Sequence, residues 1–352
     1  MDLSYLFFLS SGLFLGWSLG ANDAANIFGT AVGSKMVRFK FIAAVASIFV
    51  IIGAVFGGSG TSATLENLGS VNALAGAFMV ALSAALSVYF MLRTGVTVST
   101  SQAIVGAIIG WNIYAGKNTD LNTLAQIVST WTVCPLLSGV IAVLLYLLLK
   151  KVQKCSSMHL LMRDQSTRIG LIMTAAAGAY ALGANNIANV VGVFIKSCPF
   201  KPVNFGGLLT LDSVQVLFLL GAVAISVGIF TYSHKVIKTV GNNLMRMSPT
   251  VALIIVLSQA IVLFIFSSVS LHDWLKNSAL PTIPLVPVSS TQAVIGAILG
   301  IGLIKGGRSI NWGIIGKIIL GWILAPAFAL MICFVCLFFL ENVFNQTVFF
   351  AD

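Results

Sequence analysis

The sequence predicts an all-α polytopic membrane protein of about ten apolar helical segments, arranged in two inverted-topology repeats with broken or re-entrant helices at the midplane. Of its 352 residues, 58% are hydrophobic and 8% are charged, whereas soluble proteins carry ~25% charged residues. The apolar residues form long continuous blocks rather than the short alternating strands of an outer-membrane barrel. Two polar motifs also occur twice, in the same order. These observations exclude a soluble globular protein.

The apolar blocks define the helices, because a membrane span needs about 20 mostly apolar residues. The blocks cover residues 3–19, 39–58, 72–92, 96–115, 125–149, 169–188, 206–232, 248–270, 288–304 and 318–340. Residues 150–168 are rich in lysine and arginine and contain no long apolar run. We therefore expect a first repeat over residues 1–149, a cytoplasmic linker over 150–168 and a second, inverted repeat over 169–352.

The basic residues lie between the apolar blocks and set the expected orientation. If the N-terminus is outside, fifteen of them face the cytoplasm: Lys35, Arg38, Lys40, Arg93, Lys150, Lys151, Lys154, Arg163, Arg168, Lys235, Lys238, Arg246, Lys305, Arg308 and Lys317. The outer loops hold Lys117, Lys196, Lys201 and Lys276. The positive-inside rule then places both termini outside a plasma or inner membrane. Because the net charge of +10 is spread over these gaps, we do not expect nucleic acid as a partner.

The first duplicated motif combines asparagine, aspartate and glycine. Residues 19–29, LGANDAANIFG, align with residues 182–192, LGANNIANVVG. With five crossings per half, the second copy enters the membrane from the opposite side, as in transporters built from inverted repeats. Amide, carboxylate and glycine-freed backbone oxygens are ligands that alkali cations accept, and polar groups at this depth are costly without a partner. The expected cation ligands are Asn22, Asp23, Asn26, Asn185, Asn186 and Asn189. The alternative is that the asparagines only bridge neighbouring helices.

The second duplicated motif places hydroxyl side chains at a helix start. Residues 98–110, VSTSQAIVGAIIG, align with residues 288–300, VSSTQAVIGAILG. A helix N-terminus offers unpaired N–H groups and partial positive charge, so two such ends can converge on one tetrahedral oxyanion. The expected anion-binding residues are Ser99, Thr100, Ser101, Gln102, Ser289, Ser290, Thr291 and Gln292. Ordinary N-caps are the alternative.

The depth of the first Ser-Thr-Ser segment depends on the preceding helix. If residues 72–92 span fully, the segment lies at the cytoplasmic edge. If residues 77–115 form a re-entrant hairpin, its tip reaches the midplane and Arg93 can approach the anion. Both arrangements return the chain to the same side, and we favour the re-entrant one. Asp212 is expected either in an outer vestibule or as a simple interfacial carboxylate.

The two motifs together resemble those of the PiT family of inorganic phosphate transporters. The resemblance rests on residues 20–26 with Gly29 and Thr30, on the second copy at residues 183–192, and on the paired Val-Ser segments followed by Gly-Ala-Ile. It implies an inverted-repeat symporter that carries phosphate with sodium or protons. The family's Asn-Asp motifs and Ser-Thr loops line one shared site, and the resemblance places these roles here on Asn22, Asp23, Asn185, Asn186, residues 99–102 and residues 289–292.

Two departures from the family pattern bear on coupling. Asn186 stands where the family usually carries aspartate, which removes a negative charge and leaves the number of coupled ions open. Gln102 and Gln292 stand where many relatives carry histidine, and this favours sodium over protons. We expect sodium-coupled phosphate symport, with sodium as the coupling ion and no other cofactor.

Other functions remain as alternatives. Proton-coupled phosphate symport and transport of sulfate or another tetrahedral oxyanion fit the same donors, and a channel would share the polar motifs. An enzyme is not expected, because the buried Asp23 has no neighbouring histidine. Membrane lipids are expected partners, and the sequence leaves a homodimer open.

Overall fold

The computed structural model describes residues 3–33, 35–94, 97–155, 159–206, 209–240, 248–307 and 310–350. Within these ranges the chain forms thirteen α-helices, one 3-10 turn (η1) and one two-stranded antiparallel sheet. The longer helices are α1 (Leu3–Gly33), α2 (Phe39–Gly57), α4 (Leu74–Arg93), α5 (Thr100–Tyr114), α6 (Leu121–Cys155), α7 (Leu160–Val191), α8 (Ser213–Thr231), α10 (Pro249–Ser267), α12 (Ser290–Ile304) and α13 (Trp312–Asn342). The shorter elements are α3 (Ser59–Leu68), η1 (Gly192–Phe194), β1 (Val203–Phe205), β2 (Leu209–Leu211), α9 (Ser233–Val240) and α11 (Val269–Asn277).

Each predicted apolar block coincides with one of the ten longer helices, and this confirms the all-α polytopic fold. Seven described helices are long and apolar enough to cross a membrane: α1, α2, α4, α6, α8, α10 and α13. Helices α5 and α12 have 15 residues each, and at 1.5 Å per residue they extend only about 22 Å. Since the hydrocarbon core is about 30 Å thick, neither crosses it alone.

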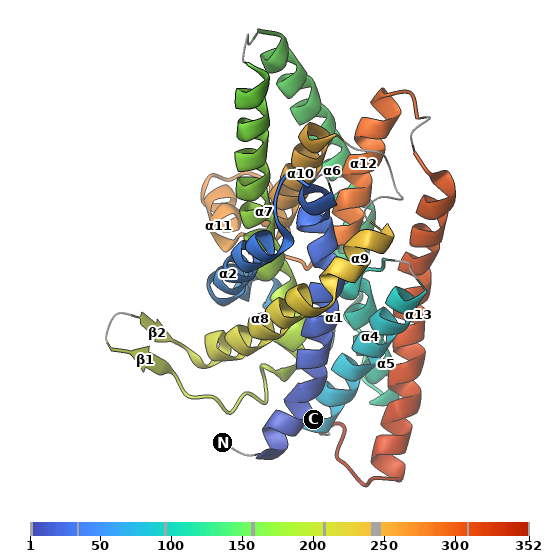
Figure 1. Ribbon diagram of the computed structural model, residues 1–352. Coiled ribbons are helices and arrows are strands. Elements are labelled where there is room, and N and C mark those ends of the chain that lie inside the picture. Colours follow the sequence, from blue (N-terminus) through green and yellow to red (C-terminus); the bar gives the residue numbers. More distant parts are fainter. Residues whose placement is uncertain are drawn as a thin grey trace.

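Helix α5 forms a hairpin with α4, and α12 forms a second hairpin with α10. The two hairpins point toward each other. Figure 1 shows α4 and α5 in the lower half of the molecule and α10 and α12 in the upper half. The N-terminal ends of α5 and α12 meet, because Ser101 donates a hydrogen bond to the Val288 carbonyl and Thr291 donates one to the Val98 carbonyl, both at 3.3 Å. The hairpin α4–α5 therefore takes the re-entrant course.

Two long helices support the hairpins through matching close contacts. Helix α12 packs on α6, where a Cβ added at Gly296 would lie 2.0 Å from the Pro135 carbonyl oxygen. Helix α5 packs on α13, where a Cβ added at Gly106 would lie 2.1 Å from the Pro326 carbonyl oxygen. In each pair a proline inside the long helix faces a glycine of the short one. Glycine is required at both crossings because any side chain would overlap the opposing backbone.

Several elements differ from the sequence-based expectation. The predicted linker, residues 150–168, is not a simple loop: α6 continues to Cys155 and α7 begins at Leu160. Helices α3, α9 and α11 and the β1–β2 hairpin were not predicted, because they are shorter than the apolar blocks. Arg246 and Arg308, both counted in the orientation argument, lie outside the described residues.

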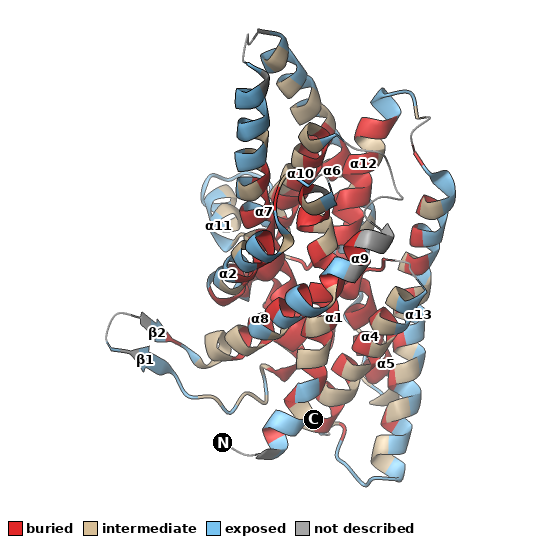
Figure 2. Ribbon diagram, in the orientation of Figure 1, coloured by how far each residue is buried: buried red, intermediate tan, exposed pale blue. Residues whose placement is uncertain are grey.

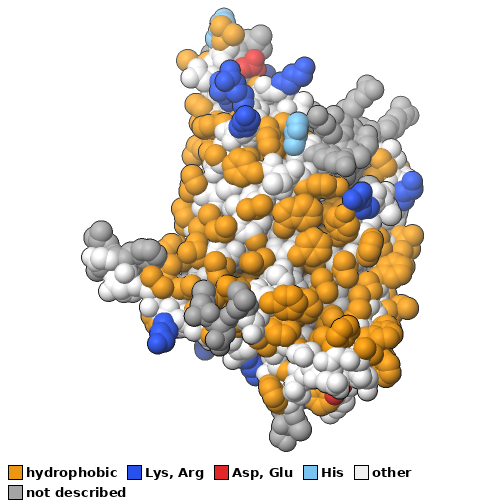
Figure 3. Space-filling view, turned by 60° about the horizontal axis from the view of Figure 1, so that its bottom comes forward, with side chains coloured by type: hydrophobic (Ala, Val, Ile, Leu, Met, Phe, Trp, Pro, Cys, Tyr) orange, Lys and Arg blue, Asp and Glu red, His pale blue; other side chains and the backbone are white. Residues whose placement is uncertain are grey.

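Burial follows the arrangement of the hairpins. Figure 2 shows the buried residues along the centre of the molecule, where α1 lies beside the hairpins, and exposed residues along the outer helices. Figure 3 shows hydrophobic side chains over the middle of one face, with lysine and arginine toward its ends. Both termini lie at the same end in Figure 1, opposite the α6–α7 tip.

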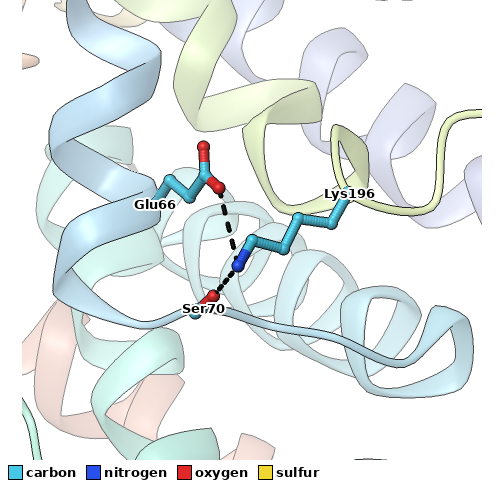
Figure 4. A network of polar contacts seen from close by, with 3 residues as sticks. All are labelled: Glu66, Ser70 and Lys196. Carbon is cyan, nitrogen blue, oxygen red and sulfur yellow. Dashed lines mark hydrogen bonds and ion pairs between the residues drawn. The ribbon is translucent and has the colours of Figure 1, made fainter.

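A polar contact near the terminal end of the molecule links the segment around α3 to the turn after η1. The Lys196 ammonium lies 3.6 Å from the Glu66 carboxylate and also donates to the Ser70 hydroxyl (Figure 4). The Lys196 and Glu66 side chains are 42% and 41% exposed. Solvent therefore screens the pair, and its contribution to stability is at most about 1 kcal/mol.

Candidate functional site

The two Asn-rich motifs lie within continuous helices rather than at helix breaks. Helix α1 runs unbroken through residues 22–26, and α7 runs unbroken through residues 185–189. The expectation that glycines free backbone carbonyls here is therefore wrong, because the glycines serve close helix packing instead. Gly20, for example, lies against the Ile225 carbonyl, and Gly183 against that of Val50. The motif presents side-chain oxygens, not backbone oxygens.

The Ser-Thr motifs begin α5 and α12 and cap them. Ser99 Oγ accepts a hydrogen bond from the Gln102 backbone N–H at 3.2 Å, and Ser289 Oγ accepts one from Gln292 at the same distance. Both serines are thus N-caps in the ordinary sense. The following residues, Thr100 and Ser290, stand at the first helical positions with the unpaired N–H groups of each helix start.

The first Asn-rich motif contacts both hairpin tips. Asn22 Nδ2 donates to the Val98 carbonyl at 2.9 Å, and Asn26 Nδ2 donates to Thr291 Oγ1 at 3.3 Å. Thr291 in turn donates to the same Val98 carbonyl at 3.3 Å. Helix α1 therefore holds the start of α5 and the start of α12 together.

The second Asn-rich motif repeats this pattern with the roles of the hairpins exchanged. Asn185 Nδ2 donates to the Val288 carbonyl at 2.7 Å, and Asn189 Nδ2 donates to Ser101 Oγ at 2.8 Å. Ser101 donates to the Val288 carbonyl at 3.3 Å. The matching contacts bring all four predicted motifs into one cluster at the centre of the molecule.

The cluster is almost entirely closed to solvent in this conformation. Asn22, Asn185, Asn186 and Asn189 are 0% exposed and Asp23 is 2% exposed. The side chains of Ser99, Thr100, Ser101, Gln102, Ser289, Ser290, Thr291 and Gln292 are 1–2% exposed. Only Asn26 among the predicted site residues is partly exposed.

Four buried amide oxygens of this cluster have no hydrogen-bond donor. They are Asn22 Oδ1, Asn189 Oδ1, Gln102 Oε1 and Gln292 Oε1. An unpaired buried acceptor costs about 1–3 kcal/mol. A ligand that brings cations or hydroxyl donors to these oxygens would offset that cost.

Asp23 is the acidic member of the cluster. Its Oδ1 accepts a hydrogen bond from Asn22 Nδ2 at 2.7 Å, and Ser290 stands beside the carboxyl group. The described residues contain no cluster of three or more His, Cys, Asp or Glu side chains of the kind that holds a transition metal. Carboxylate, amide and hydroxyl oxygens instead suit hard cations.

Two conspicuous charged residues lie outside the cluster. Arg93 is exposed at the end of α4, where its guanidinium donates to the Tyr89 hydroxyl at 2.6 and 3.0 Å, so it does not approach the predicted anion site. Asp212 caps α8 and accepts from the Gln215 backbone N–H at 2.7 Å. Its role is that of a helix cap.

Sequence reasoning missed the backbone partners of the site. The Val98 and Val288 carbonyls each accept from an asparagine and from a hydroxyl of the opposite hairpin. Both valines immediately precede the Ser-Thr motifs. An apolar side chain does not indicate that its backbone carbonyl accepts hydrogen bonds. The one available signal was that both valines occupy the same position in the two copies of the motif.

The sequence pattern of the phosphate transporter family matches residues 19–333, and matches again over residues 278–350. The chain belongs to this family. A protein of Methanocaldococcus jannaschii named "Putative phosphate permease" is 29% identical over 335 residues, which cover 95% of this chain and 97% of that protein. A protein of the same description from Pyrococcus abyssi is 24% identical, over 92% of this chain and 94% of that protein.

A solved structure has the same fold. It is described as the sodium-dependent phosphate transporter, and it superposes with a TM-score of 0.78 at 22% sequence identity over 97% of this chain and 100% of that one. At this level of identity the match establishes the fold. Together with the family, it makes this chain a multi-pass membrane transporter and not an enzyme.

Proposed function

We propose that the protein is a sodium-coupled symporter of inorganic phosphate that works by alternating access. The observation that carries this proposal is the convergence of two helix N-termini and two Asn-rich motifs in one buried cluster. The solved transporter of the same fold is described as sodium-dependent, which agrees with sodium as the coupling ion.

Phosphate is assigned to the facing starts of α5 and α12. Each start offers backbone N–H groups, a partial positive charge and a hydroxyl at Thr100 or Ser290. Gln102 and Gln292 add amide groups two residues further on. The unpaired Gln102 and Gln292 oxygens would accept hydrogen bonds from a protonated phosphate oxygen.

Sodium is assigned to the oxygens of the Asn-rich motifs. A phosphate held only by neutral donors would be costly in a site of low dielectric, and a nearby cation offsets that charge. Anion and cation then bind better together than apart. This mutual stabilisation is the physical basis of coupling, because neither ion alone completes the site.

Burial of the site supports a carrier rather than a channel. Since the predicted ligand residues other than Asn26 are at most 2% exposed, an ion can enter or leave only after the surrounding helices move. We propose that residues 1–149 and 169–352 form the two inverted repeats, and on the basis of the loop charges we place both termini outside the membrane.

Radiolabelled phosphate uptake into proteoliposomes tests the proposal. An inward sodium gradient should drive saturable uptake, and replacing sodium by potassium at the same pH should abolish it. Uptake driven equally well by a proton gradient without sodium would reverse the coupling assignment. No phosphate uptake under either gradient, together with uptake of radiolabelled sulfate, would instead identify another oxyanion as the substrate.

A further inference from the structure

The two halves of the proposed ion site can be compared residue by residue. The aligned motifs pair Asn22 with Asn185, Asp23 with Asn186 and Asn26 with Asn189. We call the first group with its hydrogen-bond partners the Asp23 half-site and the second group the Asn186 half-site. Their charges differ, because only the Asp23 half-site contains a carboxyl group.

The Asp23 half-site keeps oxygens free for a cation. The Asn22 amide turns its nitrogen toward Asp23 Oδ1, at 2.7 Å, and toward the Val98 carbonyl, at 2.9 Å. This orientation leaves Asn22 Oδ1 buried without a donor, directly beside the carboxyl group. A carboxylate also has more acceptor positions than the Asn22 amide and the adjacent Ser290 hydroxyl fill.

In the Asn186 half-site the corresponding oxygens are already occupied by protein donors. Asn185 Oδ1 accepts from the Val288 backbone N–H at 3.2 Å. Asn186 Oδ1 accepts from Asn189 Nδ2 at 2.9 Å and lies 3.2 Å from Ser101 Oγ, whose one proton it shares with the Val288 carbonyl. The Asn186 nitrogen is held as well, because it donates to the Leu182 carbonyl at 3.3 Å.

The amide hydrogens of Asn189 therefore stand where a cation would otherwise contact Asn186. One buried oxygen remains without a donor here, Asn189 Oδ1, and a single neutral oxygen does not offset the cost of dehydrating a cation. A cation would have to displace several hydrogen bonds and would gain no carboxylate in exchange.

We propose, on the basis of the proposed symport, that only the Asp23 half-site holds a coupling cation. Because the side chains of the Asn186 half-site hydrogen-bond to one another and to the backbone, the transporter carries one sodium per phosphate. Asn186 is thus the residue that determines the stoichiometry. A carboxylate at this position would accept the same two donors and still offer free oxygens and a negative charge to a second sodium.

The accumulation ratio measures this stoichiometry directly. In proteoliposomes clamped at zero membrane potential, a tenfold sodium gradient should support about tenfold phosphate accumulation with one sodium and about hundredfold with two, since each tenfold gradient contributes about 1.4 kcal/mol. We expect tenfold for the natural protein. The sodium dependence of its initial rate should give a Hill coefficient of about 1.

Asn186→Asp provides the matched variant. It should raise the accumulation ratio toward hundredfold and the Hill coefficient toward about 2. It should also make uptake more sensitive to an inside-negative potential, because one additional positive charge moves per cycle whichever phosphate species is carried. A potential of 100 mV then changes the limiting accumulation by a further factor of about 50. The double variant Asp23→Asn/Asn186→Asp again has a single carboxylate. It should return to one sodium per phosphate and therefore to about tenfold accumulation.

Sodium binding to the purified natural protein, measured by isothermal titration calorimetry with saturating phosphate, decides the matter even if a variant fails to fold. One sodium per chain supports the inference. Two sodium ions per chain, or hundredfold accumulation by the natural protein, overturn it while leaving the symport intact. Absence of any sodium-dependent phosphate uptake would instead overturn the proposed function itself.

Discussion

The contact between α12 and α6 makes a sharp prediction for Gly296→Ala. The added Cβ would lie 2.0 Å from the Pro135 carbonyl oxygen and 2.5 Å from the Pro135 Cα. Ordinary contact begins at 3.4 Å, so the two helices must separate by roughly 1.4 Å. Backbone atoms on both sides leave no flexible side chain to give way, and overpacking of this kind costs about 1–3 kcal/mol.

The separation matters more for transport than for stability, because α12 carries the second Ser-Thr motif at its start. A displacement of about 1 Å at a ligand-positioning group can reduce a rate by about 10²-fold. We expect Gly296→Ala to lower phosphate uptake by about this factor and to lower the thermal unfolding midpoint. Gly106→Ala should behave in the same way, since its Cβ would lie 2.1 Å from the Pro326 carbonyl oxygen.

The assay is proteoliposome uptake, normalised to folded protein, beside thermal unfolding in detergent. Gly316→Ala on α13 is the matched control, because a Cβ there meets nothing within 4 Å. Alanine also favours a helix over glycine by about 1 kcal/mol, so this control should be neutral or slightly stabilising. Wild-type uptake and an unchanged midpoint for Gly296→Ala would refute the close packing of α12 on α6.

Three further predictions concern charged side chains. Asp23→Asn removes the carboxylate of the proposed cation site. It should raise the half-saturating sodium concentration for uptake by about 10- to 100-fold, the size of a lost charged interaction. An unchanged half-saturating sodium concentration would contradict the assignment. Lys196→Gln and Glu66→Gln each break an ion pair whose side chains are 42% and 41% exposed. Each should lower the free energy of unfolding by no more than about 1 kcal/mol. A larger loss in denaturation experiments would show that the ion pair contributes more to stability. Arg93→Gln should leave the KM for phosphate within about twofold, because the exposed guanidinium bonds to Tyr89 and not to the site; a tenfold rise in uptake KM would place Arg93 in the phosphate path.

The helices were predictable because their signal is local. A block of apolar residues specifies a membrane helix without reference to the rest of the chain, and each of the ten blocks coincides with one of the longer helices. Element ends were less predictable. The block at residues 3–19 stops at the polar motif, whereas α1 continues to Gly33, because packing against α8 and the hairpins satisfies the polar side chains that the hydropathy pattern counts against a helix.

The depth of the Ser-Thr motifs was not decided by the sequence. Loop charges could not separate a full span from a re-entrant hairpin, since both return the chain to the same side. The distinction depends on contacts between distant residues, such as Ser101 with Val288. No local pattern specifies which carbonyl a hydroxyl will meet when the two residues are 187 positions apart.

Those distant contacts bear on how binding and motion would be joined in the proposed cycle. The bonds from Asn22 to Val98 and from Asn185 to Val288 stay within one proposed repeat, whereas Ser101 and Thr291 each donate to the carbonyl of the other repeat. The bonds from Asn26 to Thr291 and from Asn189 to Ser101 also cross between the repeats. Separation of the two helix starts must therefore break the hydroxyl bonds to Val98 and Val288, and it can leave the bonds of Asn22 and Asn185 to these carbonyls intact. The same hydroxyls adjoin the helix starts assigned to phosphate, so a bound anion would compete for or replace the bonds that join the two helix starts. Anion binding and separation of the two helix starts then involve the same hydroxyl groups. The anion therefore has different affinities for the conformations with these bonds formed and broken, and a ligand can shift a conformational equilibrium only through such a difference.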